Sequence, residues 1–181
     1  MQIKRVEPKT YTYNITLDEN DEEYTSCVWA DFIFNCDSGR LVINSDAGDY
    51  SYCWGFNKNE DFMHLMGRVN RDYLLKKLSY ENCFLLEESK NKTINMIEDI
   101  GYNCFDFATE EDWKNCKEEI LNLDSLVAGN EIHFWDEIEK LVPEIDERTI
   151  CIEKDYPYGA KLIVDIFIKY LQPKIREEFN Q

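Results

Sequence analysis

The stretch YTSCVWADFIFNCDSGRLVINSDAGDYSYCWG, residues 24–55, decides the fold of the first third of the chain. Its apolar and aromatic residues form short runs, and the turn sequences DSG at 37–39 and DAGD at 46–49 separate them. Runs rich in β-branched and aromatic residues, bounded by Asp and Gly, are typical of strands joined by tight turns. We therefore predict strands over 24–35, around Leu41–Ile43 and around Tyr50–Trp54.

A further strand is expected upstream, over Thr10–Leu17. Tyrosine, isoleucine and leucine alternate there with threonine and asparagine, which is the period of a half-buried strand. The acidic tip at 18–23 then turns the chain. Four strands joined by short turns indicate an antiparallel meander.

After Gly55 the apolar period changes from two to that of a helix. Phe62, Leu65, Met66 and Val69, for example, lie three or four residues apart. We expect Pro143 to end one helix and Pro173 to end or kink the last. The predicted helices are Asn59–Val69, Leu74–Leu78, Thr93–Tyr102, Thr109–Leu123, Asn130–Val142 and Tyr158–Leu171, with a short strand at Thr149–Glu153.

These elements predict an α+β fold, an N-terminal four-stranded antiparallel meander packed by several C-terminal helices. No linker or repeat marks a boundary, so one domain is expected over 1–181, strand-rich at 10–55 and helix-rich at 59–180. Two details of the helices bear on packing. Trp135, Ile138 and Val142 should point inward, and the helix at 158–171 is apolar nearly all round, which predicts burial or cover by a partner subunit.

The chain is strongly acidic, with 37 Asp and Glu against 20 Lys and Arg and a net charge of −17. The stretch 106–147 alone holds 14 acids and only three bases, Lys114, Lys117 and Lys140. Such charge disfavours nucleic-acid phosphates and anionic membranes as partners, and it favours basic surfaces. The bulk surface is therefore not expected to bind nucleic acid directly, although an oligomer could gather Arg68, Arg71, Lys76 and Lys77.

The seven cysteines stand singly, and no CxxC pair occurs among them. This spacing argues against a zinc site or a disulfide framework and is typical of reduced thiols. The N-terminus lacks the apolar core of a signal peptide, and no apolar run of 18 residues occurs. A cytoplasmic location is the expectation.

No catalytic constellation is visible. The two histidines, His64 and His133, fall in different predicted helices, and the seven glycines are too scattered for a phosphate-binding loop. Asp46 and Asp49 could offer oxygens to a cation, which keeps a metal-dependent hydrolase as an alternative, but a β-turn needs Asp and Gly for its own geometry. We expect a protein that is not an enzyme, with no cofactor and no metal.

The acidic helices are the more unusual signal. Glu110 can reach Lys114, and Asp136 can reach Lys140. Glu118 and Glu119 have no cation ahead of them within a turn, and Glu131, Glu137 and Glu139 have none in reach along their helix. Uncompensated carboxylates repel one another, so their accumulation is consistent with a partner that neutralises them. A solubilising face is an equally consistent interpretation. The candidate partner-binding residues are Glu110, Glu111, Asp112, Glu118, Glu119, Glu131, Glu137 and Glu139, with the tip residues Glu19, Asp21, Glu22 and Glu23 as second choice.

The segments LVINSDAGDYSYCWG and FMHLMGRVNRDYLLKKLS, within residues 40–79, carry a resemblance. They resemble a pattern in small proteins of phages and mobile elements, in which a strand, an SDxGDYxYxW turn and strand, an amphipathic helix and DYLLxKL follow in order. In size and charge the chain is also similar to anti-CRISPR inhibitors of type II-A Cas9 from such elements.

The resemblance implies stoichiometric inhibition of a Cas9-type nuclease, with carboxylates mimicking nucleic acid in a basic groove. The binding surface, the effector and the step blocked are not fixed by this resemblance. A different binding protein remains an alternative, a phage or host subunit that forms homo-oligomers through its apolar C-terminal helix.

Overall fold

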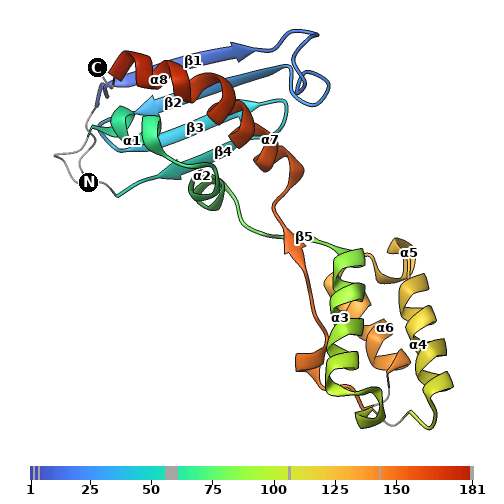
Figure 1. The fold of residues 1–181 in the computed structure, drawn as a ribbon. Helices are drawn as coiled ribbons and strands as arrows, with labels where there is room; N and C mark the ends of the chain where they lie inside the picture. Colours follow the sequence, from blue (N-terminus) through green and yellow to red (C-terminus); the bar gives the residue numbers. More distant parts are fainter. Residues whose placement is uncertain (2, 4, 56–60, 106, 143, 180–181) are drawn as a thin grey trace. The chain divides into compact units, whose positions relative to one another are not determined.

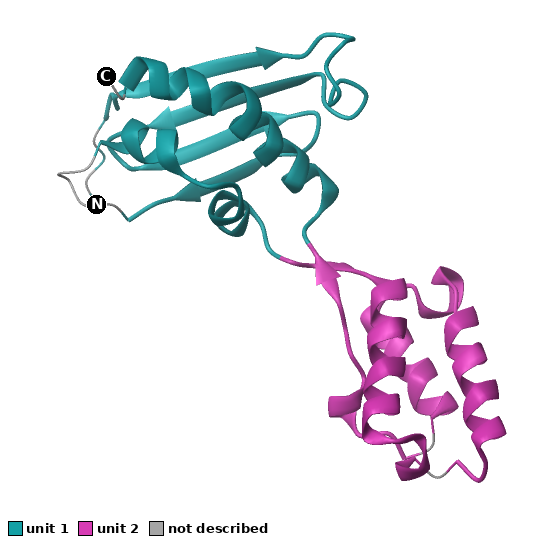
Figure 2. Ribbon diagram, in the orientation of Figure 1, with its two compact units in different colours: residues 1–80, 156–181 teal, residues 81–155 magenta. Residues whose placement is uncertain are grey.

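The computed structural model of the chain describes all residues except 2, 4, 56–60, 106, 143, 180 and 181. Its contacts gather into two compact units, coloured separately in Figure 2. Unit 1 consists of residues 1–80 and 156–181, and unit 2 of residues 81–155. Unit 2 is thus an insertion within unit 1, and each unit is described by itself.

Unit 1 is built on a four-stranded antiparallel sheet in the order β1-β2-β3-β4 (Figure 1). This meander confirms the predicted α+β class. The second strand starts later than the predicted Tyr24, because hydrogen bonds from Tyr24 N to Asp21 O and from Cys27 N to Glu23 O fold that segment into turns. The strands are β1 Thr10–Thr16, β2 Trp29–Asn35, β3 Arg40–Ser45 and β4 Tyr50–Cys53.

Alternation along the strands decides which side chains are buried. Across the sheet Tyr13 pairs with Phe32, Phe32 with Ile43, and Ile43 with Tyr50, so these four side chains share one face. Phe32 and Ile43 at the centre are fully buried. Threonine, asparagine and serine predominate on the opposite face, and their side chains are largely exposed or half-buried.

Helices cover the apolar face of this sheet (Figure 1). The ring of Phe167 lies 5.8 Å from that of Phe32 and 6.5 Å from that of Phe34, and all three are fully buried. The apolar C-terminal helix is therefore buried within its own unit. The elements are α1 Phe62–Arg68, α2 Arg71–Leu78, α7 Tyr158–Ile166, the π-helical segment η3 Phe167–Leu171 and α8 Gln172–Phe179.

Pro173 was predicted to end or kink the last helix. The helix does not end there, because it continues through α8 to Phe179. A π turn precedes the proline, in which Gln172 N–H donates to the carbonyl of Phe167, five residues back. Such a turn shifts the hydrogen-bonding register at the point where proline lacks a donor. The buried Gln172 side chain donates to the carbonyls of Met66 and Val69 at 3.2 and 2.6 Å, which ties α8 to the end of α1.

Unit 2 packs short helices around a second core, separate from that of unit 1. The centre of this core holds Ile97, Phe134 and Ile138, all fully buried. A two-residue antiparallel pair, β5 with β6, joins the ends of the insertion. Its elements are β5 Cys83–Phe84, α3 Leu86–Ile100, the 3-10 turn η1 Tyr102–Cys104, α4 Glu110–Asn122, α5 Ser125–Ala128, α6 Glu131–Leu141, the 3-10 turn η2 Glu147–Thr149 and β6 Lys154–Asp155.

Three predictions in unit 2 need correction. The strand predicted at Thr149–Glu153 is wrong, since the segment begins as the turn η2 and pairing starts only at Lys154. Helix α3 begins at Leu86, seven residues before the predicted start, because its first turns bury the polar Ser89 and Lys90. On α6 the fully buried aromatic residue is Phe134, while Trp135 is half-buried.

The single domain expected over 1–181 differs from the two units that the contacts define. Each unit buries its own set of apolar side chains, so the division reflects two hydrophobic cores. Some predictions fall on residues outside the described part of the chain. These are the helix start at Asn59 and Glu60, the helix stop at Pro143, and Asp106 as the first residue of the acidic stretch 106–147. Within the described part, α1 begins after the N-cap Asp61, whose side chain accepts from Met63 N at 2.8 Å.

Candidate partner-binding surface

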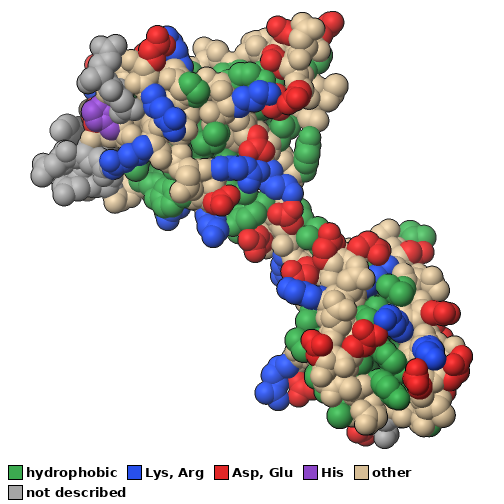
Figure 3. Space-filling view, viewed as in Figure 1, with side chains coloured by type: hydrophobic (Ala, Val, Ile, Leu, Met, Phe, Trp, Pro, Cys, Tyr) green, Lys and Arg blue, Asp and Glu red, His purple; other side chains and the backbone are tan. Residues whose placement is uncertain are grey.

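The negative charge of the chain is concentrated in unit 2. By sequence, residues 81–155 hold 21 acids and 7 bases, a net charge of −14, whereas the remainder holds 16 acids and 13 bases, a net charge of −3. Figure 3 shows Asp and Glu side chains spread over the helices of this unit. The two units therefore present very different electrostatic surfaces.

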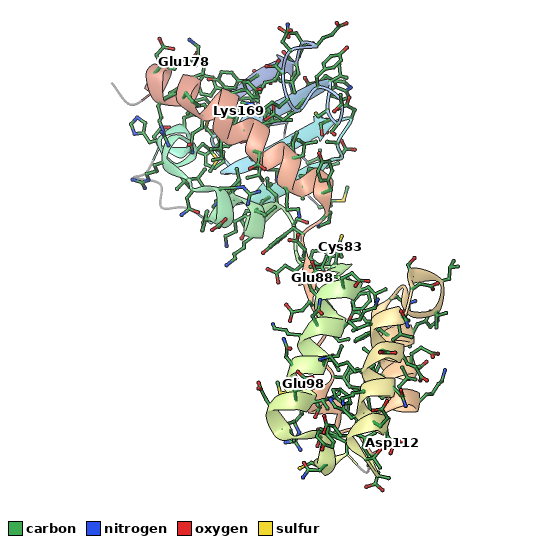
Figure 4. All side chains as sticks on the ribbon, turned by 45° about the vertical axis from the view of Figure 1, so that its right-hand side comes forward. Cys83, Glu88, Glu98, Asp112, Lys169 and Glu178 are labelled. Atoms are coloured by element: carbon green, nitrogen blue, oxygen red, sulfur yellow. The ribbon has the colours of Figure 1, made fainter. Side chains whose placement is uncertain are left out.

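Helix α4 carries five of the candidate residues, and its start is well defined. The Thr109 side chain caps the helix by accepting from Asp112 N at 3.1 Å, and the Asp112 carboxylate accepts from Thr109 N at 2.9 Å. These two bonds form a capping box at the sequence TEED, residues 109–112. The carboxylate of Asp112, which Figure 4 labels at the start of α4, therefore stabilises the first turn of its own helix.

The remaining α4 acids fall into two groups. Lys114 lies 3.2 Å from Glu110 and 4.0 Å from Glu111. Glu118 and Glu119 are exposed and make no hydrogen bond or ion pair within the described part of the chain. The nearby Lys117 is directed instead to Glu98 of α3 at 2.7 Å, which Figure 4 labels. Two of the five candidates on α4 are thus exposed and unpaired among the described residues.

On α6 the structure supplies partners that the sequence did not reveal. Glu131 pairs with Lys154 of β6 at 2.7 Å, and Glu137 pairs with Lys140 at 2.6 Å. Glu139 accepts a hydrogen bond from the indole N–H of Trp135 at 2.9 Å. The expectation that these three acids have no cation in reach along the helix is wrong for Glu137, because its i+3 neighbour Lys140 pairs with it instead of with Asp136.

Asp136 becomes the unpaired acid of α6 as a result. Its side chain is exposed and makes no hydrogen bond or ion pair among the described residues, although it was not among the candidates. The pattern of i+3 and i+4 spacings allowed Lys140 to reach either acid, so sequence alone could not choose between Asp136 and Glu137.

The acidic tip chosen second belongs to unit 1, and most of it holds the fold together. Lys169, labelled in Figure 4, lies 2.9 Å from Glu23 and 3.4 Å from Glu22, and the Tyr170 hydroxyl donates to Glu23 at 2.8 Å and to Asp21 at 3.1 Å. Burial raises the pKa of Glu23, but hydrogen bonds from Lys169 and Tyr170 outweigh it and hold that pKa below its usual range. Of the four tip candidates, Glu19 alone makes no hydrogen bond or ion pair within the described residues.

The residues considered for metal or catalytic chemistry have structural partners. Asp46 accepts from Val28 N at 2.8 Å, which fixes the chain before β2. His64 contacts the carbonyl of Phe179, and His133 lies beside its N-cap Asn130 at 3.0 Å. The described residues contain no group of three or more His, Cys, Asp or Glu placed to hold a metal ion.

The surface of α6 also contains a hollow that sequence reasoning missed. It has a volume of about 320 Å³ and is lined by Glu131, Ile132, Trp135, Asp136 and Ile152. Ile132 is 71% exposed, which is unusual for a large apolar side chain on an acidic helix. The sequence did offer one sign that Ile132 is exposed. It is the second residue of the helix and lies outside the spacing of the buried Phe134 and Ile138.

Comparison with known proteins gives a family. The model of a phage family, Phage_phiTE_072, matches residues 1–177. The chain belongs to this phage family. No curated protein and no solved structure matches it.

The Phage_phiTE_072 match covers both units, including all of the acidic insertion. Unit 2 is therefore part of what the family model describes. The phage origin implied by the resemblance over residues 40–79 is confirmed at this level. Among the described residues, no helix has the length and apolar character needed to cross a membrane.

Proposed function

We propose that this phage protein is an anti-defence protein that inhibits a Cas9-type RNA-guided nuclease by stoichiometric binding, in the cytoplasm of the bacterial host. The carboxylates of unit 2 enter a basic nucleic-acid-binding groove of the nuclease in place of phosphates. The observation that carries this proposal is the net charge of −14 on unit 2. Its helices expose Glu118, Glu119 and Asp136, which make no ion pair among the described residues.

Electrostatics supports a basic partner in particular. Unpaired carboxylates on one unit repel each other, and a cationic surface removes that repulsion when it binds. Cas9-type nucleases hold guide and target in positively charged channels and read the PAM with arginines. The phage family supplies the biological context, because a nuclease of this kind attacks phage DNA.

Binding without catalysis is the mode that fits the chemistry of the described residues. Asp46, His64 and His133 each serve a turn, a helix end or a cap. Asp46 also bonds to the thiol of Cys27, but burial, together with this carboxylate, raises the pKa of Cys27 to about 12, so the thiol stays protonated and is not an activated nucleophile. The rival interpretation, a subunit that oligomerises through its C-terminal helix, has less support because the apolar residues of α7 are buried within unit 1.

The test is cleavage of a linear target by purified Cas9 and guide RNA in the presence of the full-length protein. Inhibition should become complete near equimolar protein, as expected for a stoichiometric inhibitor. The double variant Glu118→Lys/Glu119→Lys should inhibit about tenfold less well, because four units of charge change on the surface that contacts the groove. Raising the salt concentration should weaken the wild-type complex as well.

A matched variant in unit 1 separates local contact from net charge. Glu19→Lys/Asp49→Lys makes the same charge change at two exposed residues and should inhibit within about twofold of wild type if unit 2 is the binding surface. Loss of inhibition in this variant alone would move the binding surface to unit 1. Absence of inhibition by the wild-type protein at a tenfold excess would exclude this nuclease as the target.

A further inference from the structure

The hollow on α6 combines apolar walls, an aromatic ring and carboxylates. Ile132 and Ile152 supply apolar surface, and the half-buried Trp135 supplies an indole whose N–H is already bonded to Glu139 at 2.9 Å. Glu131 at the rim is paired with Lys154, which leaves the exposed Asp136 as the rim carboxylate that makes no ion pair among the described residues. The volume of about 320 Å³ suits one long side chain.

Arginine is the side chain whose chemistry matches all of these features. Its three methylene groups can lie along isoleucine side chains, because long cationic side chains bury their stems on apolar surface. Its planar guanidinium stacks on tryptophan and pairs with carboxylates at the same time. The lysine ammonium is compact and strongly hydrated, so it makes the charge contact but stacks less well.

We propose that this hollow is a binding site for one arginine side chain of a basic protein partner. The stem of the arginine lies between Ile132 and Ile152, and its guanidinium contacts Trp135 and Asp136. This inference rests on the proposed function, since it specifies where and by which residue type a basic partner is held. It adds a local requirement for arginine to the long-range attraction of unit 2.

The experiment uses the full-length protein and two blocked peptides of equal charge, acetyl-(Gly-Arg)₄-amide and acetyl-(Gly-Lys)₄-amide. Nitrogen-15 NMR resolves one indole N–H signal for each of the four tryptophans, and a Trp135→Phe variant assigns that of Trp135. The arginine peptide should shift the Trp135 signal, and the lysine peptide should bind about two- to fivefold more weakly.

Two single substitutions separate the hollow from general charge. Ile132→Glu and Leu126→Glu each add one negative charge at the second residue of a helix, at side chains that are 71% and 90% exposed. Only Ile132 lines the hollow. If attraction were purely electrostatic, both variants would bind the arginine peptide slightly more tightly. We expect Leu126→Glu to do so and Ile132→Glu to bind more weakly than wild type.

The outcomes distinguish this inference from the proposed function. Equal binding of both peptides with no shift at Trp135, or equal behaviour of the two glutamate variants, would overturn the arginine site while leaving an acidic binding surface intact. No binding of either peptide at low salt would overturn both proposals. A Trp135 shift with arginine preference and a selective loss in Ile132→Glu would establish the site.

Discussion

Unit 1 covers a four-stranded sheet with helices and carries a net charge of −3, whereas unit 2 packs short helices around a smaller core and carries −14. Many acids of unit 1 are engaged in its own fold, as in the pairs Arg71–Asp165 at 2.6 Å and Lys169–Glu23 at 2.9 Å. In unit 2 the acids outnumber the bases three to one, so ion pairing leaves exposed carboxylates behind. The comparison teaches that most of the net charge of this protein lies in one unit, where it is exposed at the surface.

The largest expected effect concerns the separateness of the two cores. Phe32→Ala should destabilise unit 1 and Phe134→Ala unit 2 by about 3–5 kcal/mol each, because both side chains are fully buried and leave cavities. Hydrogen exchange followed by mass spectrometry should show faster exchange only in the mutated unit. Faster exchange throughout the chain in either variant would show that the two units unfold as one.

A smaller effect is expected at a buried charge in unit 2. The Lys90 side chain is 2% exposed, and its ammonium donates to Glu87 at 2.7 Å and to the carbonyl of Leu121, near the end of α4, at 3.0 Å. Lys90→Ala should lower the stability of unit 2 by about 2 kcal/mol, because the carbonyl of Leu121 loses its donor and the buried lysine side chain leaves a cavity. The measurement is a urea titration followed by α3 and α4 amide exchange.

Lys92→Ala is the control for this change. Lys92 pairs with Glu153 at 2.5 Å, but its side chain is 60% exposed. Exposed pairs contribute little, so a loss of about 0.5 kcal/mol or less is expected. Equal losses for Lys90→Ala and Lys92→Ala would show that the buried ammonium has no special role in joining α3 to α4.

The capping box at the start of α4 should contribute about 1 kcal/mol. Thr109→Ala removes the acceptor for Asp112 N, while Thr109→Ser retains a hydroxyl in the same place. The alanine variant should unfold at a lower urea concentration and the serine variant close to wild type. Identical midpoints for alanine and wild type would mean that the packing of α4 alone defines its start.

The smallest expected effect is that of salt. Screening should stabilise unit 2 by about 0.5 kcal/mol between low salt and 0.5 M sodium chloride, because repulsion among its excess carboxylates declines. Unit 1, near neutrality, should change less. Amide exchange at both salt concentrations reports the units separately, and a larger gain in unit 1 would contradict the charge comparison.

Most of unit 1 could be predicted from the sequence, because period-two alternation and Asp-Gly turns specify a meander without reference to distant residues. Unit 2 was harder. The first turns of α3 bury Ser89 and Lys90. The hydrogen-bond partners of these polar side chains come from residues far along the chain, such as the carbonyl of Leu121 for Lys90. The spacing of apolar residues therefore could not predict that α3 starts at Leu86. The second core was missed for the same reason, because its contacts join residues that are distant in the sequence.

The candidate surface was predicted in part. Local spacing correctly identified Glu118 and Glu119 as acids without a cation ahead of them, and the structure leaves both without an ion pair among the described residues. Glu131 was different, since its partner Lys154 comes from a strand 23 positions later. The hollow beside it depends on Ile152 from another segment, and no spacing rule within α6 could have indicated it.

The insertion of unit 2 has a consequence for synthesis. The sheet of unit 1 leaves the ribosome early, but Phe167 and the rest of α7, η3 and α8 follow only after the whole of residues 81–155. Until then the nascent sheet displays Phe32, Phe34 and Ile43 to its surroundings. The contiguous unit 2 can fold in that interval, and its charge keeps the unfinished chain apart from other copies.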